Sequence, residues 1–331
     1  MGLCSSQALQ RAMLMRQDLL VDQTTELLQT AGFLTSNRCD VRSRCFDITA
    51  RKGSVLLFLK MLSNIDGLSE GTALELKKLA EYFFGSPLLI GEKARDHELQ
   101  GGAVYVRYGI PAVNVDTLSD FFLHELPPLI YAAPGGLYVK LDERALYAAR
   151  THMNLSLGAI ASELGVSRRS IRKYEEGMDA KVEIAVRLEA LFDAPLAVPI
   201  NLLTPRACTT KTTRADSLPP IEREAVSLLV SLGFRVLPLF QAPFEVLSQT
   251  EEETLLTGIS KNTSLMAKRA ELMSSISQVV FARSLYITDE EPKFFRISNT
   301  VIVCLEELEQ LDSSTELVDL VRERSEDWLR L

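Results

Sequence analysis

Two short amphipathic stretches joined by a glycine-led turn occupy residues 155–177, and they restrict most strongly what this chain can fold into. Ser156 stands where a helix N-cap belongs, because its hydroxyl can accept a hydrogen bond from the first turn. Gly165 can adopt the left-handed conformation that ends a helix, and Ser167 can cap the next one. The apolar residues of the first stretch recur at helical spacing: Leu157, Ile160 and Leu164. The pattern predicts helix, tight turn, helix.

The second stretch, GVSRRSIRKYEEG (165–177), carries four cations within six residues. At about 100° per residue, Ile171 and Tyr174 fall at about 300° and 240° from Arg168, so both face a core. The cations fall on the opposite face, at about 0°, 100°, 40° and 140°: Arg168, Arg169, Arg172 and Lys173. A solvated outer face is the alternative interpretation. The tight turn upstream favours a helix that enters a DNA major groove.

The chain as a whole is acidic, so the four cations form a local cluster of positive charge. The formal net charge is −8 and the isoelectric point is about 5.2. Such a chain is not expected to coat nucleic acid with its whole surface. The acidic remainder is instead expected to discourage DNA from binding to the wrong face.

Residues 141–193 resemble a Cro/CI-type helix-turn-helix domain of the XRE class. The resemblance depends on LYAAR (146–150), NLSLGAIASELGVSRRSIRKYEEG (154–177) and the predicted helix VEIAVRLEALF (182–192). It implies that Arg168, Arg169 and Lys173 read bases, where arginine and lysine favour guanine acceptors. It also implies that Ser167 and Ser170 lie near phosphates and that Arg172 contacts the phosphate backbone.

Two positions depart from that family pattern. Leu157 stands where the family usually has a glutamine that binds a phosphate. Ala180 and Lys181 stand where it tends to have a proline before the fourth helix. The glutamine contact is therefore in doubt.

Nearly the whole chain is similar to a family of archaeal HTH-type transcriptional regulatory proteins. The similarity includes RCFDITARKGSVLLFLKMLSNID (44–66), SPLLIGEKARD (86–96) and YVRYGIPAV (105–113). It implies a sequence-specific DNA-binding transcriptional regulator whose partner is double-stranded DNA. Because such domains usually bind two-fold sites, a homodimer is expected.

At 331 residues the chain is long enough for several domains. The expected fold class is multidomain α+β, with an all-α Cro/CI-type helix-turn-helix bundle flanked by two α/β domains that are restriction-endonuclease-like but degenerate. The first helix is expected over 8–31, and PPLIYAAPGGLYVKLD (127–142) reads as a β-hairpin around Pro134-Gly135-Gly136. The expected boundaries are an N-terminal domain at 1–126, a hairpin connector at 127–141, the helix-turn-helix domain at 142–203, a linker at 204–220 and a C-terminal domain at 221–331.

The two flanks have the same order of expected helices and strands, which suggests an internal duplication. LLQTAGFLTS (27–36) parallels LLVSLGFRVL (228–237), and SVLLFLKMLSN (54–64) parallels ETLLTGISKN (253–262). SPLLIGE (86–92) is aligned with SQVVFAR (277–283), and YVRYGIPAVNVDTLSDF (105–121) with FFRISNTVIVCLEELEQL (294–311). The alternative is that any two α/β segments share such an order.

The N-terminal flank also raises a catalytic alternative. FDITARKGSVLLFLK (46–60) places Asp47 on one strand and Lys60 on the next, close to the restriction-endonuclease arrangement. That chemistry needs a second carboxylate for Mg²⁺, and Phe58 stands in its place. TLLTGIS (254–260) in the second flank has neither acid nor lysine. We expect no enzyme and interpret Asp47 and Lys60 as a surface or half-buried ion pair.

Three functions therefore stay open. The first is a DNA-binding regulator. The second is a nuclease or DNA-processing enzyme that uses Asp47 and Lys60. The third is an interaction protein whose helix-turn-helix contacts protein or RNA.

No cofactor or metal is expected. The five cysteines are scattered, with no pairs at zinc-ligand spacing, and reduced thiols in a cytoplasmic protein are the simplest interpretation. No membrane segment is expected either. MGLCSS at the start fits a myristoylation template, which we interpret as a coincidence because no polybasic segment follows.

Overall fold

The computed structural model describes residues 17–41, 44–203, 218–261 and 264–325. The predicted start of the first helix, the MGLCSS motif and most of the predicted linker lie outside them. The described chain divides into two compact units, one with residues 62–67 and 88–203 and the other with 17–61, 68–87 and 218–325. Helices and sheets mix as the predicted α+β class requires, and this prediction is confirmed.

The first sheet has ten strands, connected in the order β1-β2-β3-β4-β7-β6-β8-β9-β10, with β5 on β4. The strand β3 is buried from Leu56 to Met61, as expected for a strand covered on both faces. The helices in this part of the chain are residues 17–30, α2 (Glu70–Tyr82) and α3 (Val115–Leu123). The first strands are β1 (Leu34–Thr35), β2 (Ile48–Lys52), β3 (Val55–Asn64), β4 (Ser86–Ala94), β5 (His97–Glu98), β6 (Ala103–Arg107) and β7 (Ile110–Val113). A 3₁₀ turn, η1 (Ile65–Gly67), follows β3.

A β-hairpin precedes the helical segment, as the sequence predicts. Its strands are β8 (Ile130–Ala133) and β9 (Gly136–Val139), paired antiparallel with Ala133 opposite Gly136. Gly135 and Gly136 have φ of +96° and +136°, which explains why the turn contains glycines. The short strand β10 (Ala180–Lys181) adds to β9.

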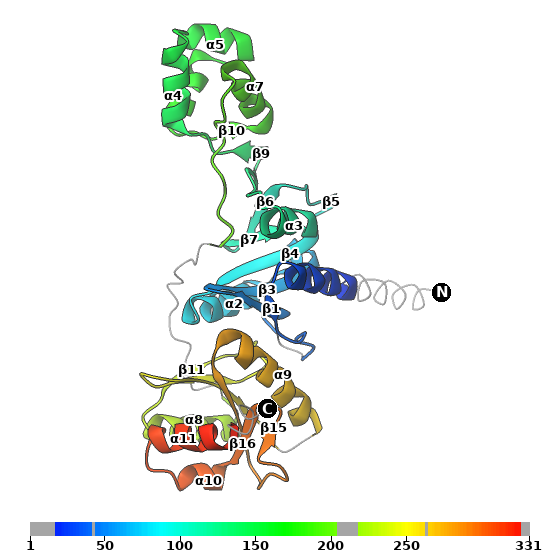
Figure 1. The fold of residues 1–331 in the computed structure, drawn as a ribbon, viewed down its shortest axis with the longest axis vertical. Helices are drawn as coiled ribbons and strands as arrows, with labels where there is room; N and C mark the ends of the chain where they lie inside the picture. Colours follow the sequence, from blue (N-terminus) through cyan, green and yellow to red (C-terminus); the bar gives the residue numbers. More distant parts are fainter. Residues whose placement is uncertain (1–16, 42–43, 204–217, 262–263, 326–331) are drawn as a thin grey trace, which may run out of the picture. The chain divides into compact units, whose positions relative to one another are not determined.

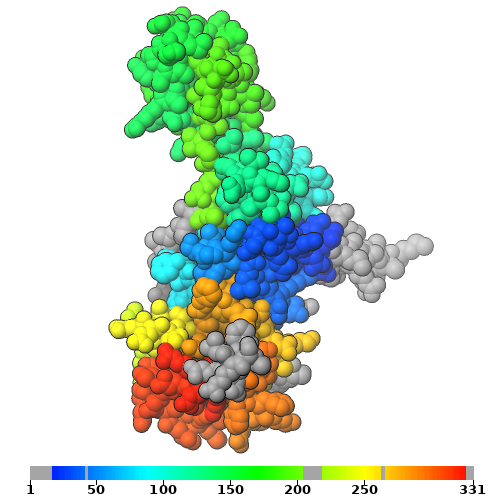
Figure 2. All heavy atoms as spheres, in the orientation of Figure 1, coloured from blue at the N-terminus to red at the C-terminus, as the bar shows by residue number. Residues whose placement is uncertain are grey.

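Four short helices form the middle of the chain and share one apolar core. They are α4 (Glu143–His152), α5 (Leu157–Leu164), α6 (Arg168–Glu175) and α7 (Val182–Phe192) (Figure 1). Leu146, Ile160, Ile171 and Leu188 come one from each helix and are all buried in this core. Figure 2 shows the atoms of the segment, in green, gathered into one rounded body.

The second sheet has six strands in the order β11-β12-β13-β14-β16-β15. The parallel strands β13, β14 and β16 are buried along nearly their whole length. The strands are β11 (Arg235–Pro238), β12 (Val246–Gln249), β13 (Thr254–Ile259), β14 (Arg283–Thr288), β15 (Arg296–Ile297) and β16 (Thr300–Cys304). The helices are α8 (Pro220–Ser231), α9 (Ser264–Val280), α10 (Leu305–Glu309) and α11 (Ser314–Ser325).

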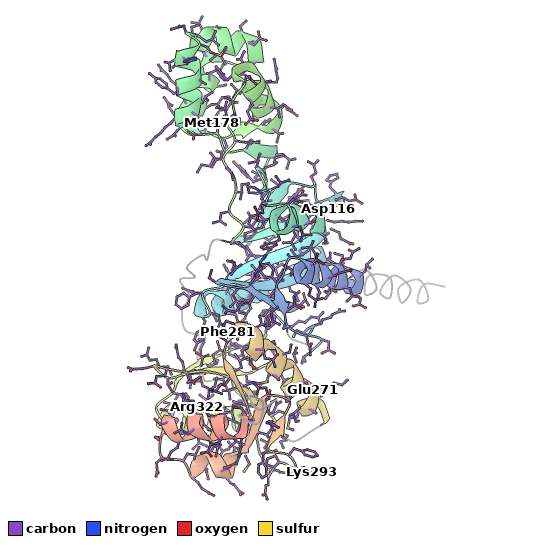
Figure 3. The ribbon with its side chains drawn as sticks, in the orientation of Figure 1. Asp116, Met178, Glu271, Phe281, Lys293 and Arg322 are labelled. Atoms are coloured by element: carbon purple, nitrogen blue, oxygen red, sulfur yellow. The ribbon has the colours of Figure 1, made fainter. Side chains whose placement is uncertain are left out.

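Six strands of the first sheet have the same order as the second sheet, β1-β2-β3-β4-β7-β6 beside β11-β12-β13-β14-β16-β15. In both sheets the fourth and fifth strands of this order are parallel and the last pair is antiparallel. Between helix and following strand, each sheet has a phenylalanine with positive φ, Phe84 at +52° and Phe281 (labelled in Figure 3) at +58°.

One predicted parallel between the flanks is wrong. Residues 277–280 of SQVVFAR belong to α9, so they cannot match the strand SPLLIGE. The strand in the corresponding place is β14, RSLYIT. Val279 and Val280 resemble a strand in sequence because both are buried, yet they form the last turn of a helix.

Among the described residues, no helix is both long and apolar enough to cross a membrane.

Candidate nucleic-acid interface

The turn between α5 and α6 has the geometry that its sequence predicts. Gly165 ends α5 with φ of +66°, a left-handed conformation that glycine adopts without strain. Ser167 caps α6 by accepting a hydrogen bond at 3.0 Å from the backbone N–H of Ser170. Ser156 caps α5 in the same way, at 3.1 Å from the N–H of Ala159. The predicted helix boundaries are confirmed.

The inner face of α6 is formed by the two residues assigned to it. Ile171 is 0% exposed and Tyr174 is 7% exposed, and both belong to the helical core. Burying these two side chains fixes the rotation of α6 about its axis. Its opposite side therefore faces away from the core.

That opposite side carries the four predicted cations. Ser167 also lies exposed at the start of the helix, and its hydroxyl is 2.9 Å from the partly buried hydroxyl of Ser170. Within the described part of the chain, none of the four cations has an ion-pair partner. A compact surface of unpaired positive charge can bind phosphates and base edges. The exposed cations are Arg168, Arg169, Arg172 and Lys173.

Arg168 lies across the start of α5. A Cβ atom built on Gly158 would be 2.8 Å from Nε and 3.0 Å from Cζ of Arg168. The absence of a side chain at Gly158 therefore leaves the space in which the guanidinium rests. Sequence reasoning missed this role, because glycine near a helix start is usually assigned to the backbone.

A charged contact holds the far end of α6 against α4. Arg150 donates to both carboxylate oxygens of Glu175, with Nε–Oε1 at 2.5 Å and Nη2–Oε2 at 3.2 Å. Its Nη1 also donates to the carbonyl of Leu155 at 3.3 Å. The hydrogen bonds to Glu175 raise the pKa of Arg150. Glu175 is therefore paired within the helical domain.

The last turn of α5 is held by a residue that the sequence did not single out. Arg187 in α7 donates to the carbonyl of Leu164 at 3.0 Å and to that of Glu163 at 2.6 Å. Carbonyls at a helix C-terminus lack intrahelical partners and attract cations. The sequence feature that could have predicted this contact is an arginine on the side of α7 that faces α5.

The two departures from the family pattern have structural counterparts. Leu157 is partly buried and packs against the helical core, so an apolar side chain suits its place. Ala180 and Lys181 form β10, with Ala180 opposite Val139 and Lys181 opposite Tyr138. A proline lacks the N–H that strand pairing can use, which favours other residues here.

The predicted catalytic remnant around Asp47 is buried and filled by cations. Arg44 Nε lies 2.8 Å from Asp47 Oδ1, and Lys60 Nζ lies 3.4 Å from Oδ2. The backbone N–H of Met61 donates to Asp47 Oδ2 at 2.7 Å. Asp47 is 0% exposed and Lys60 is 7% exposed, so the prediction of a surface or half-buried pair is wrong. Arg44, Lys60 and the backbone N–H of Met61 together compensate the cost of burying this charge, and Arg44 is the closer of the two cations.

Phe58 occupies the place of the second acid and completes an apolar environment. Its ring packs edge-on against Phe46, with centroids 5.8 Å apart, and it stacks on Phe83 at 6.0 Å. Mg²⁺ needs oxygen ligands, and these residues offer one carboxylate that two cations already neutralise. The residues present do not fit the metal of an active nuclease. Among the described residues, no group of three or more His, Cys, Asp or Glu side chains could hold a metal ion.

Comparisons with known proteins agree with both parts of this description. Residues 17–128 match the PD-(D/E)XK superfamily domain, and residues 146–198 match a helix-turn-helix family. No solved structure matches the chain.

Curated relatives extend over almost the whole length. A protein of Methanocella arvoryzae is 45% identical over 94% of this chain and 97% of its own. One of Methanococcoides burtonii is 44% identical over 94% of this chain and 98% of its own. One of Natronomonas pharaonis is 43% identical over 94% of this chain and 100% of its own. Their names all begin "Putative HTH-type transcriptional regulatory protein". With this identity along nearly all of its length, the chain belongs to the family of archaeal HTH-type transcriptional regulatory proteins.

Proposed function

We propose that this protein is a sequence-specific DNA-binding transcriptional regulator that reads the major groove with residues 167–176. The observation that carries the proposal is the face of α6, where four unpaired cations lie opposite the buried Ile171 and Tyr174. A helix that is fixed by its core and presents cations outward suits the major groove. The helix-turn-helix match and the names of the relatives support the same function.

Roles follow from position on the helix. Arg168, Arg169 and Lys173 read base edges, where arginine and lysine donate to guanine O6 and N7. Ser167 and Ser170, at the start of the helix, contact phosphates. Arg172 contacts the phosphate backbone and adds affinity with little specificity.

The rest of the chain is proposed to organise this reader. The helix-turn-helix domain spans 142–203, after a hairpin connector at 127–141. The N-terminal flank at 1–126 is proposed to be a nuclease-like domain, and the C-terminal flank at 221–331, which follows a linker at 204–220, a copy of it. Each chain has one helix-turn-helix among its described residues, so a two-fold operator would require a homodimer.

A nuclease-like domain is present, and we propose that it does not catalyse. Arg44 and Lys60 neutralise Asp47, and Phe58 offers no ligand. Cleavage of DNA that requires Mg²⁺ and is lost in both Asp47→Asn and Lys60→Ala would contradict this proposal.

The decisive experiment is a DNA shift assay on sites recovered by genome-wide mapping of the bound protein. The variant Arg168→Ala/Arg169→Ala should lose at least about 30-fold in specific affinity, because each base contact contributes about 1–3 kcal/mol. Lys268→Ala/Lys293→Ala removes two exposed cations, one on α9 and one in the loop before β15, and serves as the matched control. Specific binding equal to that of the wild type in the first variant would refute the proposal. Light scattering of the complex tests the dimer, which a monomer on a single half-site would contradict.

A further inference from the structure

The second sheet contains a residue in the position that Asp47 has in the first. In the first sheet Ile48 pairs with Leu59, and in the second Val246 pairs with Thr257. Asp47 directly precedes β2, and Glu245 directly precedes β12. The two sheets share their strand order, so Glu245 lies at the corresponding point of the second one.

The hydrogen bonds of the two acids match. The N–H of Asp47 donates to the carbonyl of Leu59 at 2.7 Å, and that of Glu245 to the carbonyl of Thr257 at 3.1 Å. The carboxylate of Asp47 accepts from the N–H of Met61 at 2.7 Å. The carboxylate of Glu245 accepts from the N–H of Ile259 at 2.7 Å. In both sheets, the residue after the acid pairs with a residue of the next strand, Leu59 or Thr257. The acid accepts a hydrogen bond from the backbone N–H two residues beyond that partner.

A guanidinium faces each acid. Arg44 approaches Asp47 at 2.8 Å, and Arg269 of α9 approaches Glu245 at 2.7 Å through Nη2. The side chains of Arg269 and Glu245 are only 17% and 12% exposed. This contact is therefore largely shielded from water, and removing either partner would leave a costly buried charge.

The position of Lys60 is filled differently in the second sheet. Its counterpart is Gly258, and a Cβ there would lie 2.6 Å from the ring of Tyr286. The Tyr286 hydroxyl lies 2.8 Å from the hydroxyl of Ser260. The ring of Tyr286 and the sulfur of Met273, which would be 2.9 Å from such a Cβ, therefore occupy the space that a lysine side chain would enter.

Burial shifts the pKa of two carboxylates in this sheet's surroundings, Glu245 and Glu222. Burial raises the pKa of Glu245, and the charge of Arg269 opposes that rise. Burial, and then the charge of Glu245, raise the pKa of Glu222 in α8, which Arg269 again opposes. The positive charge of Arg269 therefore favours the ionised form of both acids.

We propose that the second flank holds another degenerate nuclease-type acid site, in which Glu245 is the acid and the guanidinium of Arg269 takes the place of a divalent cation. Both flanks would then descend from one nuclease-like domain, and in each of them an arginine would have replaced the metal ion beside the acid. This inference does not depend on DNA binding by α6. It predicts that removing the guanidinium, and nothing else, leaves the Glu245 carboxylate free to accept a hard cation.

The test uses the full-length chain and thermal unfolding with and without millimolar Mn²⁺. Wild type should show no shift in Tm with Mn²⁺. Arg269→Met should melt at a lower temperature, and Mn²⁺ should raise its Tm by about 4 °C, because a ligand that binds only the folded state stabilises it. Glu245→Gln/Arg269→Met should not respond to Mn²⁺. Lys268→Met, an exposed neighbour on α9, is the matched control and should behave like the wild type.

Equal responses of Arg269→Met and the double variant to Mn²⁺ would overturn the proposal. If Arg269→Met does not fold, Arg269→Lys supplies the second arm, because a shorter cation fits the same acid less well. The Tm of Arg269→Lys should be lower than that of the wild type, and the Tm of the double variant Glu245→Gln/Arg269→Lys should be no lower still. A strictly additive loss in that double variant would show that the two residues are not paired and would also overturn the proposal.

Discussion

Arg150 and Glu175 join the first and third helices of the DNA-binding domain through two hydrogen bonds, at 2.5 and 3.2 Å. Their side chains are 16% and 11% exposed, so the pair is neither a surface contact nor fully buried. Arg150 also binds the carbonyl of Leu155, in the turn that leads into α5. One side chain therefore orients both helices of the helix-turn-helix.

Arg150→Met should destabilise the domain by about 2 kcal/mol, since hydrogen bonds to charged groups contribute about 1.5–3 kcal/mol. Glu175→Gln should cost less, because the amide oxygen can still accept one hydrogen bond from Arg150. Urea unfolding measures both, and Arg144→Met on the exposed side of α4 is the control. A double variant whose loss equals the sum of the single losses would show that the pair is not coupled.

Gly158→Ala should alter DNA recognition without destabilising the protein. The new methyl group would meet Arg168 at 2.8 Å from Nε, and a flexible guanidinium moves more easily than a backbone. Alanine in a helix is favoured over glycine by about 0.5–1 kcal/mol, so stability should hold or rise. Competition shift assays should then show a changed preference at the base pair for which Arg168 is the proposed reader.

Gly165→Ala is the matched control for that substitution. The backbone there has φ of +66°, where a Cβ is strained, so we expect a loss of about 1 kcal/mol. Arg168 keeps its space, so base preference should stay as in wild type. The reverse pattern, with altered preference in Gly165→Ala alone, would contradict the role given to Gly158.

The sequence predicts α6 well because the information that specifies this helix is local. Eight residues at helical spacing decide that Ile171 and Tyr174 face inward, and the core confirms both. The burial of Asp47 could not be predicted in this way. It depends on Arg44, which reaches the acid from the irregular loop before the strand, and such a loop has no periodicity to interpret.

Glu245 was missed for a related reason. The segment between the first two strands runs from 36 to 47 in one sheet and from 239 to 245 in the other, so sequence alignment loses register there. Only the pairing of β12 with β13 shows that Glu245 and Asp47 correspond. Loop length is weakly constrained by stability, whereas strand register is strongly constrained.

The salt dependence of DNA binding should separate the phosphate contact from the base contacts. Arg172→Ala should reduce the slope of log K against log salt by about 0.9, the value expected when one phosphate is no longer neutralised by the protein. Affinity should fall about equally for operator and unrelated DNA. Arg169→Ala should instead weaken the operator more than unrelated DNA. If Arg172→Ala changed base preference, the roles given to these two residues would be reversed.

The hairpin next to the domain offers a test at high pH. Tyr131 of β8 donates its hydroxyl proton to Asp179, and its ring stacks on Tyr138 with centroids 6.0 Å apart. Burial, and then the neighbouring carboxylate, raise the pKa of Tyr131 from 10.0 to about 12. The folded protein therefore holds this proton more tightly than the unfolded chain does.

A raised pKa stabilises the fold fully below pH 10.0, and this contribution is lost as pH rises towards about 12. Tyr131→Phe removes the group, so the stability difference between wild type and variant should shrink across that range. The ultraviolet titration of phenolate should lose its latest-ionising step in the variant, while Tyr147→Phe, an exposed residue of α4, should leave that step in place. A late step that persists in Tyr131→Phe would assign the shifted ionisation to another tyrosine and separate Asp179 from it.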